Sequence, residues 1–261
     1  MSDPSGKRVI IKIGTGVLTR PHDGALNHAM LGRLIQSVSD LVEAGHQVLV
    51  VSSGAVGAGM SALQLDERPT ETGMLQACAA VGQARLMQIY DSGFRNFNLK
   101  VAQLLLTNED FEVEKRRENV LHTLQCLTEQ SEVVPIINEN DSVAVYELRF
   151  GDNDNLSSKV AELMGVDLLI LLTSVPGLRG PDSIDENDIV EYVENLDEVM
   201  DFADDSKGRL SVGGMASKLQ AVRFTVNAGI ETIIASGTNP EQLSELVEGR
   251  GIGTRFAPAS N

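Results

Sequence analysis

The sequence contains no tryptophan, and only two cysteines and four histidines among its 261 residues. The cysteines, Cys78 and Cys126, have no paired spacing, so neither a disulfide framework nor a zinc site is indicated. We interpret both as reduced cysteines packed in the core. The four histidines lie outside all the motifs described below, which argues against a catalytic histidine.

Positive charge is also scarce, because 21 lysines and arginines face 37 acids, which gives a formal charge of −16. A polyanionic partner requires a basic surface, so this charge argues against nucleic acid and anionic membranes as partners. No apolar run approaches the roughly 20 residues of a membrane span, and we expect a cytoplasmic protein. A site for anionic metabolites must therefore supply its own local lysines.

Apolar runs of strand length alternate with amphipathic segments of helix length along the whole chain. We predict strands at 9–13, 47–53, 100–107, 133–138, 167–173 and 231–236. We predict helices at 27–45, 73–98, 115–130, 155–164, 215–229 and 240–249. Such alternation predicts an α/β fold whose mostly parallel sheet is covered by helices on both faces.

Glycine, hydroxyl and amide residues gather where these strands end. In a parallel sheet, ligands bind beyond the carboxyl ends of the strands, so these positions are candidates for function. They are 14–16, 53–59, 138–141 and 173–174, and two further clusters at 151–155 and 213–215 precede helices. The P-loop motif is absent, so any phosphate site here is of another kind.

Two lysines stand in unusual places. Lys12 interrupts the apolar strand 9–13, which fits either an edge-strand lysine reaching solvent or a cation directed at phosphate beside Gly14 and Gly16. Lys218 falls in the first turn of a predicted helix, where a cation opposes the helix dipole unless an anion is bound. Together they could serve phosphoryl transfer between two anions.

The polar clusters 138–141 and 151–155 contain eight acids and amides. Helix capping and turn formation account for some of them. Carboxylates and amides together suit a ligand that carries both an ammonium and a carboxylate group, as an amino acid does. The glycine-rich run 53–59 could surround an anion with backbone N–H groups, or could simply allow a tight packing turn.

The segment 182–205 contains eleven acids and no basic residue. Its apolar positions still allow a strand and a short helix. We interpret it as a solvated surface excursion, with a regulatory or lid segment as the alternative.

Five motifs match the amino acid kinase family in order: IKIGTGVL at 11–18, VSSGAVGAG at 51–59, VPIINEND at 134–141, GDNDNLS at 151–157 and GGMASKLQA at 213–221. The chain resembles this family over roughly 7–257. The resemblance implies a three-layer αβα sandwich and ATP-dependent phosphorylation of a carboxylate. The motif INEND followed by GDNDNL resembles the corresponding motifs of the family members that phosphorylate the γ-carboxylate of L-glutamate. That reaction is the first step of proline biosynthesis.

The resemblance also implies an organisation of the chain. It describes 1–261 as one kinase domain, with a glutamate-binding lobe at about 7–165 and an ATP-binding lobe at 166–258. The printed chain ends where the kinase region ends, so we expect no C-terminal domain resembling RNA-modification enzymes.

Site residues follow from the resemblance position by position. Lys12 and Lys218 would stabilise the transferring phosphoryl group, and Asp154 would position both lysines. Contacts to glutamate are implied for Ser53, Asp141, Asn153, Asn138 and Gly54. Contacts to ATP are implied for Lys12, Gly14, Thr173, Ser174, Val212, Gly213, Gly214, Met215, Ala216, Ser217 and Lys218. Ser174 and Val212 depart from the aspartate and threonine that the family pattern has there.

The implied cofactors are ATP and Mg²⁺, the metal being held mainly by the ATP phosphates with no protein ligand assigned. The implied partners are glutamate, proline as a feedback inhibitor, glutamyl phosphate reductase to consume the labile product, and further copies in a homodimer or homotetramer. Kinases for acetylglutamate, aspartate or carbamate are alternatives, as is a non-catalytic amino-acid sensor on the same scaffold.

Overall fold

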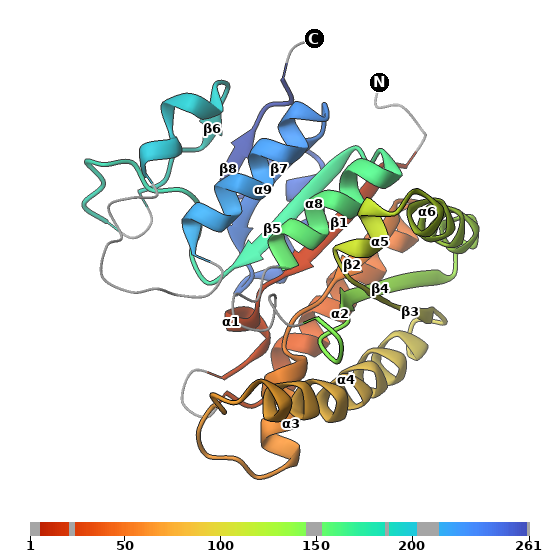
Figure 1. Ribbon diagram of the computed structural model, residues 1–261. Coiled ribbons are helices and arrows are strands. Elements are labelled where there is room, and N and C mark those ends of the chain that lie inside the picture. Colours follow the sequence, from red (N-terminus) through yellow and green to blue (C-terminus); the bar gives the residue numbers. More distant parts are fainter. Residues whose placement is uncertain (1–5, 21–23, 145–152, 186–187, 203–213, 260–261) are drawn as a thin grey trace.

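The computed structural model describes residues 6–20, 24–144, 153–185, 188–202 and 214–259. An eight-stranded sheet runs through the molecule in the order β3-β4-β2-β1-β5-β7-β8-β6 (Figure 1). All neighbouring strands are parallel except β7 and β8, which are antiparallel. The strands are β1 (Arg8–Ile13), β2 (Gln47–Val51), β3 (Lys100–Leu106), β4 (Val133–Glu139), β5 (Leu168–Thr173), β6 (Tyr192–Val193), β7 (Glu231–Ser236) and β8 (Gly253–Phe256).

Helices cover both faces of this sheet, which confirms the predicted three-layer α/β sandwich. One face packs against α2 (His28–Glu43), α4 (Thr72–Arg95) and α10 (Leu243–Val247). The opposite face packs against α6 (Glu114–Thr128), α8 (Asn153–Met164) and α9 (Met215–Asn227), as Figure 1 shows for α8 and α9. Two continuous apolar cores result, one on each side of the sheet.

Residue alternation along β1 shows how the strand serves both cores. Val9, Ile11 and Ile13 belong to the core beneath α2, whereas Ile10 belongs to the core beneath α8 and α9. Side chains alternate between the two faces of a strand, so Lys12 is on the same face as Ile10. The sequence of β1 therefore places one lysine toward the α8 and α9 layer.

Three short helices, α1 (Thr15–Leu18), α3 (Ala55–Ala62) and α5 (Glu109–Glu112), were not expected, and neither was strand β8. Helix α3 occupies the glycine-rich run, where composition favours a loop. It is helical because it lies directly against α4: a Cβ added at Gly59 would lie 1.8 Å from the carbonyl oxygen of Cys78. A Cβ at Gly82 of α4 would lie equally close, 1.8 Å, to the carbonyl oxygen of Ala55. Glycine thus lets the two backbones touch.

The acidic segment forms part of the sheet at its far edge. Its described residues include β6 and the 3₁₀ helix η1 (Leu196–Glu198), as the apolar positions suggested. Val193 and Val199 are buried in the core beneath α9. The segment is therefore anchored by apolar contacts, while the acids among its described residues face solvent.

Two further expectations can be compared with the structure. Cys78 is buried and Cys126 is exposed, and both are free thiols, so the prediction of two core cysteines is wrong for Cys126. That cysteine lies on the outer face of α6. Among the described residues, no helix has the length and apolar character needed to cross a membrane.

Candidate active site

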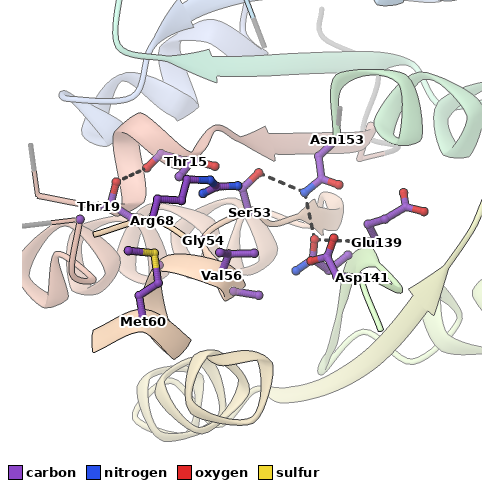
Figure 2. Close-up of a pocket in the computed structure, with 14 residues that line it drawn as sticks. Thr15, Thr19, Ser53, Gly54, Val56, Met60, Arg68, Glu139, Asp141 and Asn153 are labelled. Atoms are coloured by element: carbon purple, nitrogen blue, oxygen red, sulfur yellow. Dashed lines mark hydrogen bonds between the residues drawn. The ribbon is translucent and has the colours of Figure 1, made fainter. Parts of the chain in front are cut away.

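A pocket of about 230 Å³ opens at the carboxyl ends of the strands (Figure 2). Its walls include Ser53 after β2, Asn138 in β4 and Asn153 at the start of α8. Thr15, which follows β1, also lines it. Residues about 100 positions apart in the chain thus meet at one edge of the sheet, as the strand-end argument predicts.

Side-chain amides hold the inner wall of this pocket together. Nδ2 of Asn153 lies 2.7 Å from the carbonyl oxygen of Ser52, 3.0 Å from Oγ of Ser53 and 2.9 Å from Oδ1 of Asn138. Asn138 in turn donates from Nδ2 to Oε1 of Gln83 on α4, at 2.9 Å. A buried network of this kind fixes side-chain orientation before any ligand arrives. Ser53, Asn138 and Asn153, all predicted to contact substrate, are therefore brought together.

The first turn of α3 forms another part of the wall. Gly54 precedes this helix with φ of 94°, a left-handed conformation that glycine adopts without strain. Ala55, Val56 and Gly57 follow it and line the pocket. The N–H groups of a first helical turn lack intrahelical acceptors and attract carboxylates. The start of the glycine run thus faces the pocket and Gly59 packs on α4, while anion binding by its N–H groups stays a prediction.

Three buried charges meet immediately beside the pocket. Nζ of Lys12 lies 2.5 Å from Oδ1 of Asp154, and Nζ of Lys218 donates to Oδ2 of Asp154 at 3.1 Å. The exposed fractions are 4% for Lys12, 1% for Asp154 and 6% for Lys218. The three groups together carry one net positive charge in a site shielded from water. Buried charges of this kind interact strongly with an incoming anion.

Each member of this triad is placed by its own element. Strand β1 lies between β2 and β5 in the middle of the sheet, so the alternative of an edge-strand Lys12 is wrong. Asp154 is the second residue of α8, where an acid is favoured by the helix dipole. Lys218 is the fourth residue of α9, so its positive charge interacts unfavourably with the dipole of that helix. Its contact with Asp154 offsets part of that cost.

The pKa of Asp154 is set by opposing effects. Burial raises the pKa of this carboxyl, but the charges of Lys12 and Lys218 and their hydrogen bonds lower it by more. The net result is a pKa below the ordinary value, so Asp154 is ionised at neutral pH. An ionised Asp154 attracts both ammonium groups and holds them in place.

The residues predicted to bind ATP lie around the same strand ends. Thr173 is the buried last residue of β5, and Ser174 after it is exposed. Gly214 precedes α9, and Met215, Ala216 and Ser217 form its first turn with Lys218. Val212 and Gly213 lie outside the described residues. The N–H of Gly14 donates to the carbonyl oxygen of Leu172 at 3.0 Å, so this amide is already engaged.

Sequence reasoning missed several residues of this region, and two of them carry polar side chains that bear on the argument below. Arg68, from the loop between α3 and α4, lines the pocket (Figure 2). Gln83 lies in the middle of α4 and reaches Asn138. Neither follows a strand, and nothing in the local sequence separates them from ordinary surface and helix residues.

The described residues contain no group of three or more histidine, cysteine, aspartate or glutamate side chains arranged to hold a metal ion. Mg²⁺ is commonly bound through only one or two carboxylates together with phosphate oxygens and water. A metal that arrives with a nucleotide would therefore not require such a group.

Comparison with known proteins agrees with this arrangement. The model of the amino acid kinase family matches residues 7–236. The glutamate 5-kinase of Carboxydothermus hydrogenoformans is 42% identical over 255 residues, which cover 97% of this chain and 68% of that protein. The glutamate 5-kinase of Moorella thermoacetica is 44% identical over 255 residues, covering 97% of this chain and 67% of that protein.

Among solved structures, carbamate kinase from Giardia lamblia bound to AMP-PNP aligns with a TM-score of 0.65 at 19% identity. The alignment covers 98% of this chain and 100% of that chain, so the two proteins share a fold. The family match covers strands β1 to β7, the residues that line the pocket and the lysine–aspartate triad. The chain described here belongs to the amino acid kinase family.

Proposed function

We propose that this protein transfers the γ-phosphoryl group of ATP to the γ-carboxylate of L-glutamate, producing glutamyl 5-phosphate and ADP. The observation that carries the proposal is the position of Asn153 and Asp154, consecutive residues in the first turn of α8. Asn153 faces the pocket and Asp154 holds the two lysines. An acceptor bound in the pocket would thus lie next to the charges that transfer requires.

The pocket suits an amino acid in both size and chemistry. Its volume of about 230 Å³ is below the roughly 300–1,000 Å³ typical of drug-sized ligands. Glu139 and Asp141 can attract an ammonium group, and the first turn of α3 can attract a carboxylate. Glutamate specifically is supported by the glutamate 5-kinases that are 42% and 44% identical to this chain.

The transfer step needs no general base. The γ-carboxylate of glutamate has a reference pKa near 4.3, so it is ionised at neutral pH. One of its oxygens forms a bond to the γ-phosphorus while the bond from that phosphorus to the bridging oxygen of ADP breaks. The barrier is the approach of two anions, which Lys12 and Lys218 would lower by stabilising the transferring group.

The nucleotide would bind at the carboxyl ends of β5 and β7, in the proposed ATP lobe at 166–258. Thr173, Ser174 and Gly14 would line it with the segment 212–218, and the glutamate lobe would be 7–165. Mg²⁺ would accompany the ATP phosphates and reduce their negative charge. A homodimer or homotetramer, inhibition by proline and consumption of the product by glutamyl phosphate reductase remain predictions from the resemblance.

The decisive experiment is to trap the acyl phosphate with hydroxylamine in the presence of Mg-ATP. L-Glutamate, N-acetylglutamate and aspartate would be compared as acceptors in this assay. For carbamate, the release of ADP would be measured instead. We expect the hydroxamate of glutamate to dominate, with one ADP released per hydroxamate formed. Faster turnover of another acid would overturn the assignment of substrate. Glutamate binding without ADP release would instead indicate a sensor.

A further inference from the structure

Arg68 is the residue of the pocket wall that the transfer mechanism above does not use. It lies in the loop between Ala62, the end of α3, and Thr72, the start of α4. Within the described part of the chain, it is the only lysine or arginine that lines the pocket. In the same described part, no hydrogen bond or ion pair involves its guanidinium group.

We propose that Arg68 determines substrate specificity by binding the α-carboxylate of the amino-acid substrate, together with the first turn of α3. This inference rests on the proposed function and identifies which end of the substrate each wall holds. Guanidinium groups suit the role because their planar N–H donors match the two oxygens of a carboxylate.

The distribution of charge in the pocket supports this assignment. Two acids, Glu139 and Asp141, line it on the β4 side, and Arg68 lines it on the α3 side. Figure 2 shows these acids and Arg68 on opposite sides, with the Arg68 side chain extended toward Ser53. An α-amino acid carries its ammonium and its α-carboxylate on one carbon. A pocket with acids on one wall and a cation on the other matches that pair.

The position of the triad fixes the other end of the substrate. The γ-carboxylate must reach the buried ammonium groups of Lys12 and Lys218, which Asp154 holds. Asp154 directly follows Asn153, so the reacting end belongs at the Asn153 side of the pocket. The α-carboxylate then belongs on the other side of Ser53 from Asn153, where Arg68 and the start of α3 lie.

The loop that carries Arg68 is restricted at several points. Pro69 follows it, and a residue before proline is confined to extended backbone conformations. Leu65 donates its N–H to the carbonyl oxygen of Met60 at 2.9 Å, and Met60 itself lines the pocket. These restraints reduce the ordering cost when the arginine closes on a ligand.

The test combines a substitution with substrate analogues. 4-Aminobutyrate is glutamate without its α-carboxylate, and glutarate is glutamate without its ammonium group. The variants are Arg68→Ala and Arg68→Lys, and the control is Arg85→Ala, which removes an exposed arginine of α4 outside the pocket. For each protein, kcat and KM are measured by ADP release, with inhibition constants where an analogue turns over too slowly.

For Arg68→Ala we expect the KM for glutamate to rise roughly 10- to 50-fold, because a charge-assisted hydrogen bond is lost from a partly solvated site. The KM or inhibition constant of glutarate should rise by a similar factor, whereas that of 4-aminobutyrate should not change. Arg68→Lys should recover part of the loss, and Arg85→Ala should match the parent protein.

An equal loss of affinity for glutamate and for 4-aminobutyrate in Arg68→Ala would overturn the inference, because Arg68 would then bind a group that both molecules share. Unchanged kinetics, or a lower kcat at unchanged KM, would overturn it too. These outcomes are distinct from failure of the proposed function, in which the parent protein would show no glutamate-dependent ADP release.

Discussion

Oδ1 of Asp154 lies 2.5 Å from Nζ of Lys12, and both side chains are almost completely buried. Replacing Asp154 by asparagine keeps the shape but removes the charge that holds two lysines. We expect a loss of about 3–5 kcal/mol in the free energy of unfolding, because a buried pair is broken. We also expect kcat to fall more than about 100-fold. Chemical denaturation and ADP release measure the two effects.

The pH dependence of that stability loss provides an independent check. The pKa of Asp154 is lowered in the folded protein, so its stabilising contribution is complete above the ordinary carboxyl value near 3.9. The contribution disappears as the pH falls through the folded pKa. The stability difference between the parent and Asp154→Asn should thus be constant from pH 7 to about pH 5 and shrink below about pH 4. A difference that narrows near neutral pH would contradict the assignment.

The control for this substitution is Asp40→Asn, at an exposed position of α2. It should change the free energy of unfolding by less than about 0.5 kcal/mol.

Lys218→Ala removes one of the two cations proposed to stabilise the transferring group. We expect kcat to fall more than about 100-fold, within the range seen when one charge-stabilising donor is removed. Lys159→Ala is the matched control, since Lys159 lies on α8 and contacts Asn108 and Phe111 instead. Near-normal turnover of Lys218→Ala, measured by ADP release at saturating ATP and glutamate, would remove Lys218 from this role.

Asp141→Ala should act mainly on substrate affinity. Asp141 lines the pocket on the side that we assign to the ammonium group, which takes no part in the transfer. We therefore expect a higher KM for glutamate with kcat largely retained. Initial rates across a wide range of glutamate concentrations would measure both constants. A turnover defect at unchanged glutamate affinity would place Asp141 beside the phosphoryl group instead.

Gly59→Ala tests the close contact between α3 and α4. The new methyl group would lie 1.8 Å from the Cys78 carbonyl oxygen, so the helices must separate. We expect a loss of at least about 1–3 kcal/mol of stability. Gly32→Ala on α2 is the opposite case, because a Cβ there has nothing within 4 Å. The free energy of unfolding of Gly32→Ala should rise by about 0.5–1 kcal/mol. Thermal unfolding of both variants measures the two changes. A stabilised Gly59→Ala or a destabilised Gly32→Ala would contradict the prediction.

The main helices and buried strands could be predicted from the sequence because their apolar periodicity is strong. Helix α3 could not, because A-V-G-A-G-M-S-A is helical only through its contact with α4, which no local pattern records. Strand β8 was missed for a similar reason. Its four residues, Gly253–Phe256, form a strand through pairing with β7, and so short a run that begins with glycine gives only a weak strand signal.

Ser53 and Asn138 were located by their positions at strand ends and Asn153 by the polar cluster before a helix, and the pocket brings the three together. The rule cannot find residues that reach the pocket from other directions. Gln83 comes from the middle of a helix and Arg68 from a long loop, so only the folded arrangement connects them with the site. Lys12 illustrates the opposite case, because a lysine inside an apolar strand can be recognised before its partner is known.

The adjacency of Asn153 and Asp154 has a mechanical consequence. Their side chains diverge by about 100° around the axis of α8, yet they share one rigid turn of backbone. Any small rocking of that helix moves the substrate wall and the lysine anchor as a single body. The spacing between the Asn153 side chain and the carboxylate that anchors the two lysines is therefore fixed by one turn of helix. Mutations elsewhere could reshape the rest of the pocket without disturbing this alignment.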